Sequence, residues 1–263
     1  MQDRHSNRQK YFNEQAYTTR KYVIPYIKQH VKVKADSTVL EIGCGEGGNL
    51  IPFMELGCKI TGIDLSVTKI NNGNEFFRDH KNRNNLTLIA DDIYKRSDLG
   101  TFDIIILRDV IEHIPNQNFF MKYFRCFFHE RSIVYFGFPP WQNPFGGHQQ
   151  MCHSRILSKL PYFHILPFSI YKGVLKLFGE TEGRINDLLE IKETGISIER
   201  FEAITKANNF DTIDKTLFFI NPNYEIKFKL KPRQQSKLIA AIPWVSNFFT
   251  TCAYYILKPN FSV

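Results

Sequence analysis

The hydrophobic positions in the first half of the chain follow two alternating patterns. Short runs that are apolar on both faces, as in buried parallel strands, occupy residues 38–42, 59–63, 86–90, 102–107 and 132–138. Between them, apolar residues recur at helical spacing over residues 49–56, 66–80 and 117–129. Strands that alternate with helices predict an α/β fold, in which a mostly parallel sheet lies between two layers of helices.

Both ends of the chain and one internal stretch depart from this alternation. Helical spacing over residues 11–31, divided by Pro25, predicts a helical cover at the N-terminus. Helical pieces at 154–163 and 169–178 predict an insertion or lid, and a helix at 197–208 with strands at 211–220 and 253–257 completes a single domain. The expected parts are a cover (1–35), a ligand-binding core (36–148), the insertion (149–195) and a C-terminal helix with strands (196–263).

A glycine-rich stretch, VLEIGCGEGGNL at residues 39–50, joins the first strand to its helix. Such a loop brings backbone N–H groups close to a ligand at a helix N-terminus. Its glycines allow two interpretations. Gly43, Gly45 and Gly48 satisfy G-x-G-x-x-G, and Asp64 follows about 20 residues later, as in dinucleotide-binding proteins. Counted from Glu41, the same stretch is E-x-G-x-G-x-G.

Acidic residues follow three of the predicted strands. Asp64 ends the second strand, Asp92 comes just after the third, and Asp109 comes just after the fourth. Ligands of such sheets bind beyond the carboxyl ends of the strands. The glycine loop, these acids and the segment 139–148 should therefore form one site.

The order and spacing of four motifs resemble the class I S-adenosylmethionine (SAM)-dependent methyltransferases. The motifs are VLEIGCGEG, ITGIDLS, LIADDI and FDIIILRDVIEHI, all within residues 39–138. The resemblance implies a Rossmann-like α/β/α sandwich with seven strands in the order 3-2-1-4-5-7-6, the last antiparallel. It implies binding of SAM and of its product S-adenosylhomocysteine (SAH). The implied contacts are Glu41, Gly43, Cys44, Gly45, Gly47, Asp64, Leu65, Asp92, Ile93, Arg108 and Asp109.

The chemistry of these side chains fits SAM better than a nicotinamide cofactor. Asp64 can accept hydrogen bonds from both ribose hydroxyls, and Asp92 can accept one from the adenine amino group. Glu41 can fix the turn beside the amino-acid end of the ligand, whereas a dehydrogenase gives no role to Glu41 or Asp92. An NAD(P)-dependent oxidoreductase and a SAM-binding protein without catalysis are the alternatives.

Methyl transfer requires mainly that the acceptor atom be held against the methyl group, with a base where that acceptor is a hydroxyl. His113, in an EHIP run similar to quinone-biosynthesis O-methyltransferases, and His148 are the candidate bases, with Glu112 and Asp109 as orienting groups. His148 ends the run FPPWQNPFGGHQQ, whose Trp141 and Phe145 are expected to contact the substrate together with it. The motif N-P-P-Y of amino methyltransferases is missing after the fourth strand. A small-molecule O-methyltransferase is therefore predicted, with carbon methylation and modification of a lipid or glycan precursor left open.

The cysteine content and the N-terminal sequence indicate the cellular compartment. The five cysteines are odd in number and show no C-x-x-C spacing, so neither a disulfide framework nor a zinc ribbon is expected. His148, Cys152 and His153 lack a fourth ligand, and no metal is expected. The polar N-terminus has no apolar segment of the kind found in secretory signals, and a cytoplasmic protein is expected.

The net charge of +8 includes a basic cluster at Lys227, Lys229, Lys231 and Arg233. That cluster could attract phosphate, an acidic substrate or a membrane surface, or be a solvated face. Nothing resembles a nucleic-acid recognition module. Residues 238–257 carry no charge, but Pro243 and several polar residues interrupt them, so no stable membrane insertion is expected. No feature of the sequence indicates an oligomeric state.

Overall fold

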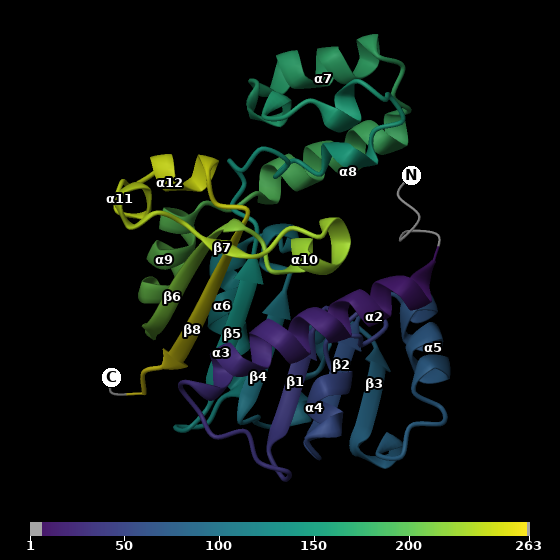
Figure 1. Ribbon diagram of the computed structural model, residues 1–263, viewed down its shortest axis with the longest axis vertical. Helices are drawn as coiled ribbons and strands as arrows, with labels where there is room; N and C mark the ends of the chain where they lie inside the picture. Colours follow the sequence, from purple (N-terminus) through teal and green to yellow (C-terminus); the bar gives the residue numbers. More distant parts are fainter. Residues whose placement is uncertain (1–6, 262–263) are drawn as a thin grey trace.

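The computed structural model describes residues 7–261 of the chain. Its strands form a single eight-stranded sheet (Figure 1). Five strands are parallel, in the order β3-β2-β1-β4-β5. They are β1 (Thr38–Ile42), β2 (Lys59–Asp64), β3 (Leu86–Ala90), β4 (Ile104–Arg108) and β5 (Ile133–Phe138). These strands confirm the predicted parallel core, with bounds that differ by no more than two residues from the expected ones.

The second half of the sheet is antiparallel. β8 (Cys252–Pro259) lies between β5 and β6 (Phe210–Ile220), which confirms the predicted late pair and its order. The prediction of seven strands was one too few. The additional strand, β7 (Arg233–Gln234), pairs with β6 and has only two residues, too few to show an alternating pattern.

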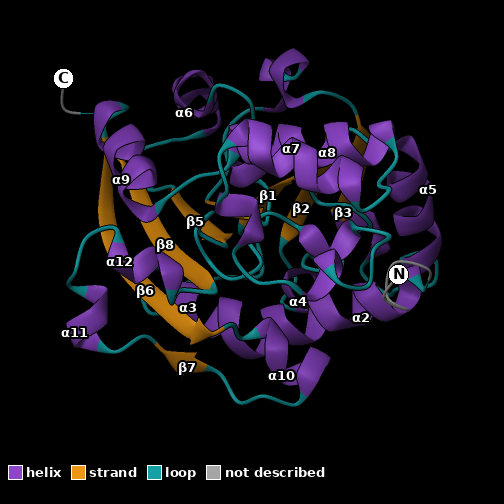
Figure 2. Cartoon of the chain, turned by 90° about the horizontal axis from the view of Figure 1, so that it is seen from above, coloured by secondary structure: helices purple, strands orange, loops and turns teal. Residues whose placement is uncertain are grey.

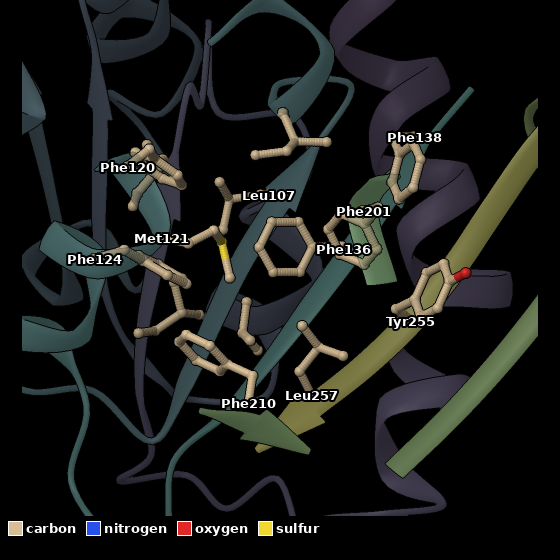
Figure 3. Close-up of a cluster of buried hydrophobic side chains, with 14 of the residues drawn as sticks. Leu107, Phe120, Met121, Phe124, Phe136, Phe138, Phe201, Phe210, Tyr255 and Leu257 are labelled. Atoms are coloured by element: carbon tan, nitrogen blue, oxygen red, sulfur yellow. The ribbon is translucent and has the colours of Figure 1, made fainter. Parts of the chain in front are cut away.

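Helices cover both faces of the sheet, as a three-layer sandwich requires (Figure 1). Neighbouring strand residues point to opposite faces: Val39 packs in one hydrophobic cluster and Leu40 in the other. The Val39 face is covered by α2 (Arg8–Thr18), α3 (Ile24–Lys28), α4 (Ile51–Glu55) and α5 (Val67–Phe76). The Leu40 face is covered by α6 (Gln117–Phe124) and α9 (Ile198–Ala207), whose aromatic side chains fill the core shown in Figure 3.

The N-terminal cover is helical as predicted, although residues 1–6 lie outside the described part. Between α2 and α3 the chain forms a π-helical turn, Thr19–Val23, just before Pro25. Proline has no N–H to donate, so the wider turn lets the helix continue through it. The expected helices at 49–56, 66–80 and 117–129 are shorter than predicted and correspond to α4, α5 and α6.

The insertion between β5 and α9 has its own small core, built around Leu157, Phe163, Tyr171, Leu175 and Leu188. The helix expected at 169–178 is confirmed as α7 (Phe168–Leu177). The helix expected at 154–163 was wrong. That segment contains Pro161, and only 3₁₀ turns form, at Leu157–Lys159 and Phe163–Ile165.

Another helix of the insertion, α8 (Glu182–Thr194), was not predicted. Three short helices, α10 (Asn223–Phe228), α11 (Lys237–Ala240) and α12 (Val245–Phe248), follow β6 (Figure 2). Within residues 7–261, every helix is too short or too polar to cross a bilayer.

Candidate functional site

The loop after β1 depends on glycine at alternate positions. Gly43, Gly45 and Gly47 have φ values of +72°, +56° and +83°, in the left-handed region that side chains disfavour. A Cβ on Gly43 would lie 2.5 Å from Val110 Cγ2. The loop is therefore shaped by the absence of side chains, and the E-x-G-x-G-x-G spacing has a physical reason.

Asp64, at the end of β2, is tied to this loop. Its Oδ2 accepts a hydrogen bond from the Gly45 N–H at 2.9 Å, and its Oδ1 accepts one from the Ser66 N–H at 2.8 Å. Each carboxylate oxygen can accept a second bond. Asp64 can thus fix the loop and still accept the two hydroxyls of a ribose.

A cavity of about 640 Å³ lies beyond the carboxyl ends of β1 to β4. Seven of the predicted site residues line it: Gly43, Asp64, Leu65, Asp92, Ile93, Asp109 and His113. Lining residues that sequence reasoning missed include Ser66, Lys69, Asp91, Tyr94 and Val110. Lys69 lies four residues after Leu65 on a predicted helix, so helical spacing from the acidic motif was the signal that could have identified it.

Two acids at the edges of the cavity adopt specialised conformations. Asp92 begins a 3₁₀ turn, with its Oδ1 accepting from the Tyr94 N–H at 3.0 Å, which leaves its other oxygen for a ligand. Asp109 has a φ of +55°, held by its N–H, which donates to the Gly137 carbonyl at 2.7 Å. Left-handed backbone at a non-glycine residue is costly and often marks a functional site.

Five other predicted contacts do not line this cavity: Glu41, Cys44, Gly45, Gly47 and Arg108. Glu41 and Arg108 instead share a buried network through Asn49. Asn49 Nδ2 donates to Glu41 Oε1 at 2.7 Å, and Arg108 Nη1 donates to Asn49 Oδ1 at 2.8 Å.

Within the described chain, Glu41 Oε2 has no hydrogen-bond partner, and burial raises the Glu41 pKa to about 8. Because Glu41 is buried and does not line the cavity, its contact with the amino-acid end of SAM stays a prediction.

The N-terminal helix holds the other side of the loop, a feature that the sequence analysis did not predict. Arg8 Nε donates to Glu46 Oε1 at 2.6 Å, and the Glu46 side chain is fully buried. A Cβ on Gly48 would lie 2.6 Å from the Phe12 carbonyl oxygen. Helix α2 therefore packs directly on the ligand loop.

Both candidate bases lie together beyond β4. The rings of His113 and His148 are 4.9 Å apart, and Glu112 Oε1 lies 4.0 Å from His113 Nε2. Among the residues described, Glu112 is buried with neither carboxylate oxygen hydrogen-bonded, and burial raises its pKa well above the usual range. Burial also lowers the pKa of His113, and it lowers that of His148 to about 3.

The same three side chains place possible metal-ligand atoms within 4.8 Å of one another. Ligands about 2.1 Å from one zinc ion lie roughly 3.5 Å apart, so the side chains would have to close around an ion. Cys152 and His153 do not belong to this group, because the His153 side chain lies 3.3 Å from Glu180.

The predicted substrate contacts Trp141 and Phe145 lie outside the cavity lining. Trp141 packs edge-on against His164, with ring centroids 4.7 Å apart, and fills the space above Gly195. Phe145 is exposed on the loop that leads to the insertion. Among the expected substrate contacts Trp141, Phe145 and His148, it is His148 that lies next to a residue lining the cavity, His113.

Comparison with known families decides between the interpretations of the glycine loop. A family model described as a methyltransferase domain matches residues 15–137, a span that includes the loop and the acidic ends of β2, β3 and β4. Residues 15–137 are a class I SAM-dependent methyltransferase domain. SAM is the cofactor of this domain.

The methyltransferase domain is similar to relatives of different specificity. It is 28% identical over 120 residues to pavine N-methyltransferase of Thalictrum flavum subsp. glaucum, covering 43% of this chain and 33% of that protein. It is 29% identical over 113 residues to ubiquinone biosynthesis O-methyltransferase of Pelagibacter ubique, covering 38% and 45%. The chain thus spans a third to a half of the length of these relatives.

Solved structures extend the likeness of fold to nearly the whole chain. Magnesium protoporphyrin IX methyltransferase from Synechocystis with bound SAH has a TM-score of 0.55 at 13% identity. This match covers 93% of the present chain and 84% of that one. The methyltransferase domain therefore has the Rossmann-like fold together with its C-terminal strands.

Proposed function

We propose that the protein transfers the methyl group of SAM to a hydroxyl oxygen of a small-molecule acceptor. The observation that carries this proposal is the cavity beyond β1 to β4, which has Asp64 and the glycine loop on one side and His113 on another. In this arrangement Asp64 binds the ribose, Asp92 and Ile93 bind the adenine, and Asp109 and Gly43 lie toward the methionine end.

His113 is the proposed base. It lines the cavity, and its lowered pKa keeps the imidazole neutral and able to accept a proton at neutral pH. His148, with a pKa of about 3, is the weaker proton acceptor, and its proposed role is to position the His113 ring. A base beside the acceptor favours a hydroxyl, because a neutral amine already carries the lone pair that attacks the methyl group.

Label transfer tests the proposal. Incubation of the full chain with methyl-labelled SAM and an extract of small metabolites should give a labelled product whose new bond is a methyl ether. A labelled product stable to mild base but with its methyl on nitrogen would contradict the hydroxyl assignment. No label transfer together with tight SAH binding would support the alternative of a SAM-binding protein without catalysis.

A further inference from the structure

The insertion and the C-terminal helices together form an open apolar groove away from the cofactor cavity. This groove, of about 720 Å³, is lined on one side by Tyr162, Ile165 and Leu166 and on the other by Val245, Phe248 and Phe249. Tyr162 Oη donates to the Phe248 carbonyl at 3.0 Å, so the two segments are joined directly. Figure 1 shows α7, α11 and α12 on the side of the molecule toward which the parallel strands point.

Other large apolar side chains are exposed in the two segments that form this groove. On the C-terminal side, Leu238 is 81% exposed and Trp244 59% exposed. On the insertion side, Phe168 and Ile170 of α7 are also exposed. We call the groove and these four residues the apolar patch. An open apolar groove in segments with further exposed apolar side chains is typical of an interaction site, since monomeric soluble proteins rarely leave large apolar patches uncovered.

The two chain segments that build the apolar patch carry basic residues only, and one acid from outside them, Glu199 of α9, accepts a hydrogen bond from the Trp244 N–H. The two segments that build it, residues 149–179 and 226–257, contain nine of the 34 basic residues of the chain and none of its 26 acidic residues. The remainder of the chain has 25 basic and 26 acidic residues, so the whole net charge of +8 resides in these two segments.

Most of these basic side chains are available to an external partner. Lys159, Lys231 and Lys237 are exposed and, within the described chain, form no ion pair. Two of the nine are engaged locally, since Lys176 Nζ lies 2.9 Å from Glu182 Oε1 and Lys227 Nζ lies 4.7 Å from the centre of the Phe228 ring. The basic residues lie in the same short segments as the exposed Leu, Ile, Phe and Trp side chains.

We propose that the apolar patch docks on the surface of an anionic lipid bilayer. A bilayer accepts this combination because apolar and aromatic side chains enter the boundary between headgroups and acyl chains, while lysine and arginine reach anionic headgroups. The interaction is peripheral, since among residues 7–261 no helix is long and apolar enough to span. A second copy of the chain fits less well, because two patches of the same positive sign would face each other.

Flotation of the full chain with vesicles tests this proposal. One vesicle sample contains phosphatidylcholine alone, and the other contains phosphatidylcholine mixed with phosphatidylglycerol. The protein should float with the anionic vesicles, stay at the bottom with the neutral ones, and be released at high salt, which screens the lysines. Failure to float with anionic vesicles, or equal flotation with both kinds, would overturn the proposal.

Two variants separate the apolar and the charged contributions. Lys231→Gln/Lys237→Gln should weaken partitioning about fivefold for each lysine removed. Trp244→Asn/Phe249→Ser should reduce flotation at least as strongly. The matched controls Lys32→Gln/Lys81→Gln and Ile213→Ser change exposed residues elsewhere and should float like the parent. Control variants that lose flotation to the same extent would contradict a specific patch.

Each variant is also examined for its melting temperature, SAH affinity and molar mass. Unchanged SAH affinity shows that lost flotation does not come from misfolding, and it keeps this inference independent of the proposed methyl transfer. If the parent forms a dimer that Trp244→Asn/Phe249→Ser dissociates, and it binds no vesicles, a second copy covers the patch and the bilayer proposal is wrong.

Discussion

The two sides of the cofactor cavity are built in different ways. On the donor side, residues 39–66 form a strand, a glycine loop, a short helix and a second strand that lie close in the sequence and are joined by backbone hydrogen bonds to Asp64. On the acceptor side, His113 and His148 come from segments 35 residues apart and meet through ring packing alone. The donor side is a local motif, whereas the acceptor side depends on tertiary packing.

This difference has a consequence for function. A local motif with glycine at fixed positions can keep one cofactor while the acceptor side changes. The relatives of this domain are consistent with that division, since their names include both an N-methyltransferase and an O-methyltransferase. Substitutions on the donor side should therefore change SAH affinity or stability. Substitutions on the acceptor side should change turnover.

The largest expected effect is on the acceptor side. His113→Gln should lower turnover by roughly 10²–10⁴-fold, the usual contribution of a general base, with little change in SAH affinity. In the parent, activity should rise with pH through the lowered pKa of His113, below 6.5, and then level off, and this limb should vanish in the variant. His129→Gln, a similarly exposed histidine beside Asp103, is the control. A parent-like rate and pH profile for His113→Gln would exclude it as the base.

On the donor side, the next expected effect is a pH dependence of the free energy of unfolding. Burial raises the Glu41 pKa from 4.5 to about 8, so the folded protein holds a proton that the unfolded chain releases within this range. The free energy of unfolding should therefore fall as pH rises from about 4.5 to 8, by at most about 1.4 kcal/mol per pH unit from this group. Urea titrations of Glu41→Gln should show a flatter profile. A parent-like slope in the variant would mean that Glu41 is ionised when buried.

The ribose contact should come next in size. Asp64→Ala removes two charge-assisted acceptors and should weaken SAH binding by about 10²–10⁴-fold, at about 1.5–3 kcal/mol for each hydrogen bond to a charged group. It should also loosen the loop, because the Gly45 and Ser66 N–H groups lose their acceptors. Asp79→Ala, at an exposed acid after α5, should bind SAH like the parent. Equal affinities in calorimetry would remove Asp64 from the ribose site.

The smallest expected effect is on the free energy of unfolding, and it is tested by comparing alanine substitutions at two glycines of similar φ. Gly43→Ala should lower the free energy of unfolding by about 2 kcal/mol or more, since it combines a left-handed alanine with a contact 2.5 Å from Val110. Gly179, after the end of α7, has a similar φ of +74° but no heavy atom within 4 Å of an added Cβ. Gly179→Ala should therefore cost about 1–2 kcal/mol and leave SAH binding intact. Equal losses would show that the loop is not packed as described.

The same contrast explains what the sequence could predict. The parallel strands, the glycine loop and Asp64 were predictable, because each is encoded by residues close together in the chain. The Arg8–Glu46 pair and the Asn49 bridge between Glu41 and Arg108 join segments far apart, and no local pattern indicates them. Helix α8 was missed although Ile185, Leu188 and Leu189 recur at helical spacing, and the helix expected at 154–163 failed at Pro161.

Calorimetric titration of the full chain with SAH and, separately, with NAD tests the central claim most directly. The glycine loop, Asp64 and Asp92 predict saturable binding of SAH in the micromolar range and no measurable binding of NAD. Tight binding of NAD without binding of SAH would contradict the assignment of this cavity to SAM.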